Sequence, residues 1–268
     1  MLEIIAKTLL LPGQEWFIMI LLIIGFWGIK RRIFGALLLA LLGSFILNKF
    51  LKHFFQVPLP PGVAPNLDAK AYGFPSGHTQ SVTLILTWLA LEWKQRWFSI
   101  GVVVWLAGYL WAIVHMGYHY PVDPPAGLIV GLWWCFTCRW LFDRPWIKDQ
   151  PYWAGVLLAL GVSPLLFFVP WVPTVGYFAG MLGFSLGWSL IEGRCEFSSQ
   201  SFFGRMFSIF GVIVAVLLCH IYIKGWFHVL LPQRWVFIGW FTFLAFVFST
   251  AGYVFRRAWG KASTIVSA

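Results

Sequence analysis

Two short segments of the sequence carry the side chains best suited to chemistry. One is Pro75-Ser76-Gly77-His78, and the other begins at His119 and ends at Asp123. Histidine can act as a nucleophile or as a general acid and base near neutral pH. A carboxylate beside an imidazole fixes its tautomer and stabilises its charged form. We therefore expect a nucleophilic or acid–base site formed by His78, His119 and Asp123.

Each segment lies where a helix is predicted to begin. Ser76 is a favourable N-cap, and Gly77 leaves backbone N–H groups uncovered, so the start of this helix can bind an anion such as phosphate. Asp123 is a candidate N-cap with Pro124 at the first helical position, within reach of His119. Taken singly, both segments are also typical of ordinary helix caps. Their pairing favours function, because the whole chain has only six His and nine Asp and Glu.

The composition excludes a soluble domain. The 268 residues are 60% hydrophobic and 10% charged, with a mean hydropathy of +0.81, whereas soluble domains are about 25% charged. The charges are gathered between long apolar runs, as a bilayer requires. We therefore predict an integral membrane protein.

The cysteines do not indicate a disulfide-rich secreted module or a redox site. All of them lie in or beside apolar runs, at positions Cys135, Cys138, Cys195 and Cys219. The first two have the spacing of a redox pair, but their apolar surroundings favour packing in the core.

Apolar runs bounded by charge, Pro or Gly predict an all-α fold, a polytopic membrane helical bundle of about nine transmembrane helices. The predicted spans are 15–29, 33–51, 77–93, 97–118, 124–142, 152–170, 173–191, 203–223 and 235–255. Several are shorter than the roughly 20 residues that cross a flat bilayer, so eight or ten spans remain open. Because Glu3 stands where a signal peptide has a basic region, we expect the first span to be retained.

The basic residues predict an orientation. If the spans alternate, one side of the membrane holds only Lys7, Lys49, Lys52, Lys70, Lys224 and Arg234. The opposite side holds the remaining 13 of the 19 Lys and Arg, and the positive-inside rule places it in the cytoplasm. The loop 52–76 and the turn 119–123 then face outward. The net charge of +10 reflects this topology and does not indicate a nucleic-acid partner, since no basic stripe is interleaved with stacking aromatic residues.

The motifs resemble those of the type 2 phosphatidic acid phosphatase superfamily of membrane lipid phosphatases. That family has Lys followed by Arg-Pro seven and eight residues later, then Pro-Ser-Gly-His, then Ser-Arg, five residues, His, three residues and Asp. Residues 75–78 match the second motif completely, Lys52 and Pro60 match the ends of the first, and His119 and Asp123 match the end of the third. The resemblance covers about residues 49–130.

The resemblance implies a phosphoryl transfer on two histidines, with no metal or organic cofactor. His119 would attack phosphorus and form a phosphohistidine, and Asp123 would orient it and balance its charge. His78 would protonate the leaving oxygen and then activate water. The residues implied to hold the phosphoryl oxygens are Lys52, Ser76 and Gly77.

Both family arginines are absent, because Leu59 precedes Pro60 and Ala112-Ile113 replaces Ser-Arg. A lone lysine does not reproduce the bidentate fork of an arginine. The other cationic or titratable candidates are Lys49, Lys70, His53 and His115, of which the two lysines are more typical of interfacial charge. A core without arginines is similar to the sphingomyelin-synthase branch, so headgroup transfer or phospholipase C-like cleavage stays open. An inactive lipid-binding protein or permease is disfavoured by the intact histidines and aspartate.

We therefore predict a membrane core at 1–148 with the motifs on spans two to five, and additional C-terminal helices of unknown role at 149–268. The expected function is dephosphorylation of a lipid or polyprenyl phosphate, with the bilayer and its lipids as partners. The expected location is the bacterial inner membrane, with the site facing the periplasm. Glu192 and His220 are further ionisable residues near later spans.

Overall fold

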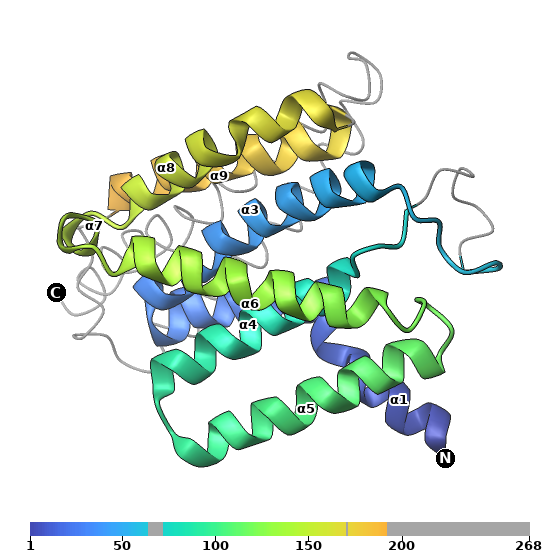
Figure 1. The fold of residues 1–268 in the computed structure, drawn as a ribbon. Coiled ribbons are helices and arrows are strands. Elements are labelled where there is room, and N and C mark those ends of the chain that lie inside the picture. Colours follow the sequence, from blue (N-terminus) through green and yellow to red (C-terminus); the bar gives the residue numbers. More distant parts are fainter. Residues whose placement is uncertain (64–71, 170, 192–268) are drawn as a thin grey trace, which may run out of the picture.

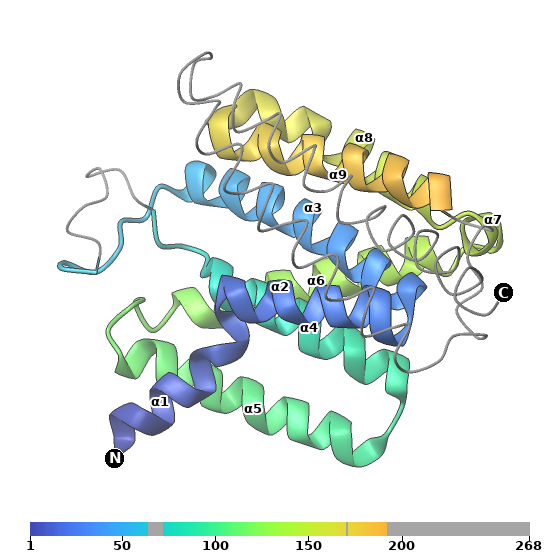
Figure 2. The ribbon, with the colours of Figure 1, turned by 180° about the vertical axis from the view of Figure 1, so that it is seen from behind.

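The described part of the protein is helical. The computed structural model describes residues 1–63, 72–169 and 171–191, and within these ranges it contains helices and one isolated antiparallel bridge, Pro58 to Tyr72, but no strand (Figures 1 and 2). The elements are α1 (Leu2–Leu10), η1 (Leu11–Gly13), α2 (Glu15–Ile24), η2 (Gly25–Ile29), α3 (Arg31–Phe55), α4 (Gly77–Trp93), α5 (Arg96–His115), α6 (Asp123–Phe142), α7 (Pro145–Asp149), α8 (Tyr152–Val162), η3 (Ser163–Phe168) and α9 (Trp171–Ile191). The predicted all-α class is confirmed for these residues.

Four of these helices are long and apolar enough to cross a bilayer: α3, α5, α6 and residues Thr174–Ile191 of α9. A fifth span results if Leu2–Gly13 and Glu15–Ile29, which meet at a bend of 49°, form one broken span. The predicted count of about nine is not confirmed. Helix α4 and the segment Tyr152–Phe168 are shorter than a full span, and the predicted spans 203–223 and 235–255 lie outside the described residues. The chain is an integral membrane protein with four to five candidate spans in its described part.

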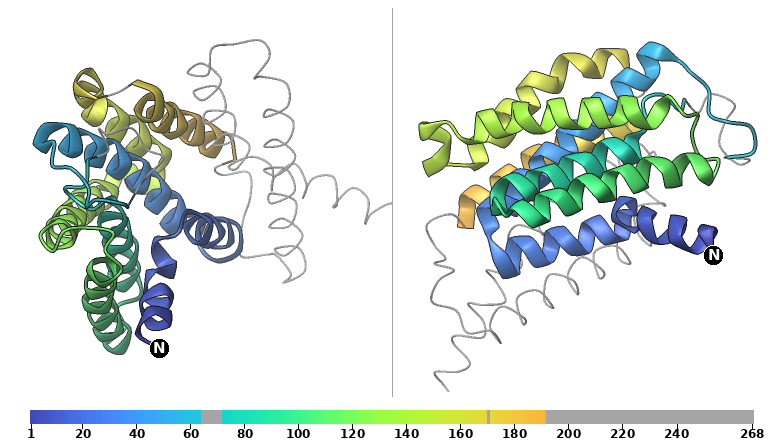
Figure 3. Two further views of the ribbon diagram at one scale, coloured as in Figure 1. Left: turned by 90° about the vertical axis from the view of Figure 1, so that its right-hand side faces the viewer. Right: turned by 60° about the horizontal axis from the view of Figure 1, so that its bottom comes forward.

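Helix α4 carries several polar side chains that its neighbouring helices cover. It runs between α3, α5 and α6 (Figure 3), and its buried side chains include Thr79, Gln80, Ser81 and Thr83. Polar groups at membrane depth are costly without partners, and Gln80 finds its partners on α3, at Ser44 and Asn48. The outer helices α5 and α6 instead expose large apolar side chains, such as Val103, Trp105, Ile129 and Trp133. These surfaces are suited to lipid.

Two apolar clusters hold the described helices together. The larger cluster contains residues of α2, α3, α8 and α9, together with residues of α4 and α6. The smaller cluster contains residues of three helices, α1, α4 and α5. Cys135 and Cys138 lie fully buried in the larger cluster with free thiols, as predicted for core residues. Cys195 and Cys219 lie outside the described residues.

The motif-bearing segments gather at one end of the bundle. The end of α3, the start of α4 and the turn from α5 to α6 all lie at the right of Figure 1. The opposite end holds basic residues at the start of α3, between α4 and α5, and at the end of α6: Arg31, Arg32, Lys94, Arg96 and Arg139. The charge therefore differs between the two ends, and the assignment of the basic end to the cytoplasm stays a prediction.

Candidate active site

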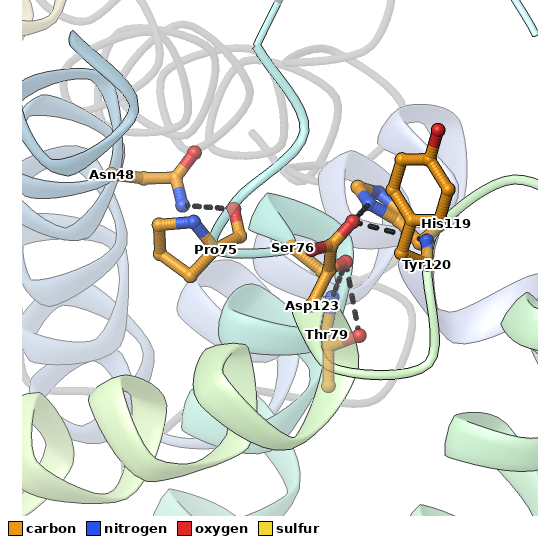
Figure 4. Close-up of polar contacts among 7 residues, drawn as sticks. All are labelled: Asn48, Pro75, Ser76, Thr79, His119, Tyr120 and Asp123. Carbon is orange, nitrogen blue, oxygen red and sulfur yellow. Dashed lines mark hydrogen bonds and ion pairs between the residues drawn. The ribbon is translucent and has the colours of Figure 1, made fainter. Parts of the chain in front are cut away.

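The turn between α5 and α6 brings His119 onto Asp123. His119 Nδ1 lies 3.0 Å from Asp123 Oδ2, and the backbone N–H of Tyr120 donates to the same oxygen at 3.1 Å (Figure 4). His119 is 7% exposed and Asp123 is fully buried. The turn itself is closed by a bond from the Asp123 N–H to the Tyr120 carbonyl oxygen at 3.0 Å. The imidazole is thus held by a carboxylate that is itself fixed by the backbone.

This contact determines which nitrogen of His119 is free. An ionised carboxylate only accepts hydrogen bonds, so Nδ1 carries the proton and Nε2 keeps its lone pair. Burial lowers the pKa of His119 below its ordinary 6.5, and the positive charges of Lys52 and His78 act in the same direction. The hydrogen bond to Asp123 raises the pKa in part. The net lowering favours a neutral imidazole, with a nucleophilic Nε2, at neutral pH.

The predicted capping role of Asp123 is wrong. Helix α6 begins at Asp123 itself, with Val122 at the N-cap position and no side-chain cap. A cap at Asp123 would place prolines at the first two helical positions. Pro125 has no N–H that could donate to the Asp123 carboxylate. The next N–H, that of Ala126, donates to the Val122 carbonyl oxygen at 3.3 Å. The carboxylate is therefore available to His119 and Tyr120.

The start of α4 is fastened directly to the start of α6. Ser76 caps α4 as predicted, accepting at Oγ from the Thr79 N–H at 3.4 Å and from the Thr79 hydroxyl at 3.1 Å. The Ser76 N–H donates to the Asp123 carbonyl oxygen at 3.2 Å. Gly127 allows this approach, since a Cβ there would lie 2.5 Å from the Ser76 carbonyl oxygen. One hydrogen bond and one close contact thus join the two predicted motifs.

The other expected site residues surround this junction. His78 lies exposed in the first turn of α4, beside Gly77, and Lys52 is half-buried near the end of α3. Lys52 and His78 are both near enough to act electrostatically on His119. The described residues contain no group of three or more His, Cys, Asp or Glu side chains arranged to hold a metal ion.

Apolar side chains occupy both positions of the family arginines. Ile113 is 2% exposed in the smaller cluster, where α5 packs on α1 and α4, and Ala112 is fully buried there. Leu59 contacts the backbone at Gly73, where a Cβ would lie 3.1 Å from Leu59 Cδ2. The buried position of Ile113 has no room for a guanidinium without repacking of its neighbours.

The remaining ionisable candidates either contact residues outside the predicted site or lie outside the described residues. The ring of His53 lies 3.1 Å from the Lys49 carbonyl oxygen and meets the Tyr72 ring edge to face. His115 is stacked on Trp111 with ring centroids 4.7 Å apart. Lys70, Glu192 and His220 lie outside the described residues.

Sequence reasoning missed three buried polar residues beneath the site: Ser44, Asn48 and Gln80. Together they form a hydrogen-bonded network between α3 and α4. The side-chain amides of Asn48 and Gln80 within apolar runs could have indicated this network, because burying a polar group at membrane depth costs free energy unless the group is hydrogen-bonded or functional.

Comparison with known proteins identifies the region that carries the site. Residues 33–147 match the sequence model of the PAP2 superfamily. This stretch is therefore similar to that superfamily, and it contains the six predicted site residues Lys52, Ser76, Gly77, His78, His119 and Asp123. The resemblance found in the motifs is confirmed.

Two curated relatives are phosphatases by name. The chain is 26% identical over 192 residues to a probable sphingosine-1-phosphate phosphatase of Dictyostelium discoideum, covering 63% of this chain and 47% of that protein. It is 35% identical over 60 residues to a lipid A 4'-phosphatase of Bacteroides thetaiotaomicron, covering 22% of this chain and 27% of that protein. The chain thus spans less than half the length of these relatives. No solved structure matches it.

Proposed function

We propose that this protein is a membrane phosphatase that removes phosphate from a lipid or polyprenyl phosphate through a phosphohistidine intermediate. The observation that carries the proposal is the buried contact of 3.0 Å between His119 and Asp123, beside the start of α4. The relatives named as sphingosine-1-phosphate and lipid A phosphatases support a phosphorylated lipid as substrate.

In the first step, Nε2 of His119 attacks phosphorus, and the bond from phosphorus to the lipid oxygen breaks. His78 gives a proton to that oxygen, so that the lipid leaves as an alcohol. The Lys52 ammonium, the Ser76 hydroxyl and the Gly77 N–H hold the phosphoryl oxygens, where charge must be stabilised in the transition state. Asp123 stabilises the positive charge on the phosphorylated imidazole.

In the second step, water attacks phosphorus while neutral His78 takes its proton. The bond from phosphorus to Nε2 breaks, which releases inorganic phosphate and restores the neutral His119. The two steps use His78 first as an acid and then as a base, so a single ring serves both half-reactions.

We place the site at the outer face of a bacterial inner membrane, facing the periplasm. The excess of basic residues at the opposite end of the bundle supports this orientation under the positive-inside rule. The lipid-suited surfaces of α5 and α6 lead to the turn that carries His119, so a substrate headgroup can reach it from the outer leaflet.

The test uses purified protein in detergent with a panel of lipid and polyprenyl phosphates, and it measures released phosphate. We expect His119→Ala and His78→Ala to reduce turnover to background while the protein stays folded. His115→Ala is the matched control, because it removes an exposed histidine at the same end of the bundle. Parental turnover by His119→Ala would show that the nucleophile is misassigned.

Trapping tests the intermediate itself. After brief exposure to labelled substrate, the label is expected on His119, lost in acid and retained in alkali as for a phosphoramidate. Absence of label during active turnover would exclude a phosphohistidine that accumulates. A protein that binds lipid phosphates but neither releases phosphate nor takes up label would be an inert binder.

A second candidate function is cleavage or transfer of a phosphodiester headgroup. It is favoured by the apolar side chains of Leu59 and Ile113, since a diester carries one negative charge where a monoester carries nearly two. The positive charges that act on His119 among the described residues are those of Lys52 and His78. In the same assay, a diester-specific enzyme would produce a phosphorylated headgroup or a new headgroup-bearing lipid instead of free phosphate.

A further inference from the structure

A buried chain of hydrogen bonds joins α3 to the entry of α4. Asn48 Nδ2 donates to the Pro75 carbonyl oxygen at 3.2 Å and to Gln80 Oε1 at 2.9 Å. Gln80 Nε2 in turn donates to the carbonyl oxygen and to Oγ of Ser44, at 3.0 and 2.7 Å. Each amide group therefore uses both of its N–H bonds. Since none of the three side chains is more than 8% exposed, the network is rigid and expensive to break.

Asn48 touches the phosphate-binding turn on both sides of Ser76. On one side it holds the Pro75 carbonyl oxygen (Figure 4). On the other side a Cβ at Gly77 would lie 2.8 Å from Asn48 Oδ1, so the backbone of Gly77 rests on the amide. The turn is thus supported from α3 by one side chain.

The same face of α3 carries the candidate phosphate lysine. Lys52 follows Asn48 by four residues, which places both on one side of the helix, one turn apart. The contacts of Asn48 therefore set the separation between Lys52 and the Gly77 N–H. Donors for a transferring phosphoryl group must be held in place before the reaction, because a displacement of about 1 Å can lower the rate about 100-fold.

We propose that Asn48 is a positioning residue for the phosphoryl site. Its amide fixes the Pro75–Gly77 turn relative to Lys52, so that one phosphoryl group meets the Lys52 ammonium and the Gly77 N–H together. Gln80 orients the amide of Asn48, and Ser44 orients that of Gln80. The inference rests on the proposed function for the use of this turn, but it does not depend on which lipid is the substrate.

The test compares kcat, KM and the inhibition constant of orthovanadate in the full-length protein in detergent. Vanadate is the probe because its five-coordinate form presents oxygens like those of a transferring phosphoryl group. Asn48→Ala is expected to lower kcat about 10- to 100-fold with KM within about threefold, and to raise the vanadate Ki about tenfold. The matched control is Thr83→Val, since Thr83 is fully buried on α4 and its Oγ1 has no hydrogen-bond partner among the described residues. This control is expected to leave all three constants unchanged.

The inhibition constant separates positioning from folding. Loss of folded protein lowers the apparent kcat but leaves Ki unchanged, because Ki does not depend on the amount of active enzyme. A reduced kcat with an unchanged Ki in Asn48→Ala would therefore overturn the proposal.

A second variant tests the chain of contacts. Gln80→Leu is expected to shift the same constants by a smaller factor, and the double variant is expected to resemble Asn48→Ala alone, because both changes break one network. Fully additive effects would contradict the network. If the parental protein neither turns over a lipid phosphate nor binds vanadate, the proposed function fails and this inference fails with it. If the parental protein is active and only the effects of Asn48→Ala are absent, the positioning role alone is wrong.

Discussion

Replacing Asp123 by Asn keeps the shape of the side chain and removes its charge from the buried pair with His119. In the parental protein, Oδ2 accepts from the ring of His119 and from the Tyr120 N–H, whereas Oδ1 is buried without a hydrogen-bond partner in the described part of the chain. An amide has a single oxygen, so its two possible orientations have different consequences.

If the amide oxygen takes the place of Oδ2, its NH2 group lies where Oδ1 has no partner, at a cost of about 1–3 kcal/mol. The hydrogen bond from His119 also loses its charge assistance, which is worth a further ~1 kcal/mol. If the amide flips, its NH2 faces Nδ1 of His119 and forces the proton onto Nε2, which then cannot attack phosphorus. The unpartnered NH2 group is present in the free enzyme too, so its cost lowers stability, whereas the weakened hydrogen bond from His119 reduces kcat/KM about 5- to 10-fold. The flipped orientation approaches the roughly 10,000-fold loss of a wrong histidine tautomer.

The pH profile gives the variant a second signature. Burial lowers the pKa of His119 below 6.5, and the bond to Asp123 raises it in part. Because the neutral ring is the nucleophile, kcat/KM falls as the pH drops through this pKa, and it also falls at higher pH where His78 loses the proton that it donates to the leaving oxygen. Removing the carboxylate lowers the pKa further, so the acid limb of Asp123→Asn is expected at lower pH, with a lower maximal rate.

Phosphate release from a lipid phosphate, followed in detergent across the acid and neutral range, measures both effects. The melting temperature and the elution volume of the variant check that it is folded. A parental maximal rate in Asp123→Asn, or an acid limb displaced to higher pH, would refute the assigned roles of the pair.

Two further substitutions test the packing around the site. Gly127→Ala places a Cβ 2.5 Å from the Ser76 carbonyl oxygen and is expected to destabilise the protein by about 1–3 kcal/mol and to lower turnover, whereas Gly101→Ala, whose Cβ meets nothing within 4 Å, is the control with an unchanged or higher melting temperature. Equal melting temperatures for the two variants would contradict the close contact. Ile113→Arg restores a family arginine but buries its charge in the cluster that contains Leu10, so we expect a melting temperature lower than that of Ile113→Leu and no gain in phosphate release. Faster release of monoester phosphate would show that the cluster opens toward the site.

The sequence predicted the motif-bearing helices well, because apolar length and helix-start residues are local signals. The Ser76 cap and the approach of His119 to Asp123 both follow from spacing within a few residues. The start of α6 was predicted one residue late, since Asp-Pro is typical of a capped start and the second proline removes the N–H that the cap requires.

The number of spans was harder to predict from local patterns. Helix α4 is too short and too polar to pass as a span in isolation, yet it lies inside the bundle because α3, α5 and α6 cover its polar side chains. A bend of 49° divides the N-terminal apolar segment. Pro12 and Gly13 indicate that the helix breaks there, but they do not indicate the angle of the bend.

By itself, the sequence predicted an all-α membrane protein and the residues expected to carry its chemistry, and it shows the similarity to the PAP2 superfamily over residues 33–147. These properties depend on composition and on residue types at short spacing. Only the tertiary structure decided that Asn48 supports the turn before His78, and that Ile113 points into apolar packing against α1. The reason is physical: hydrogen bonds and contacts between helices depend on which helix faces meet, and residues dozens of positions apart carry no local signal of that meeting.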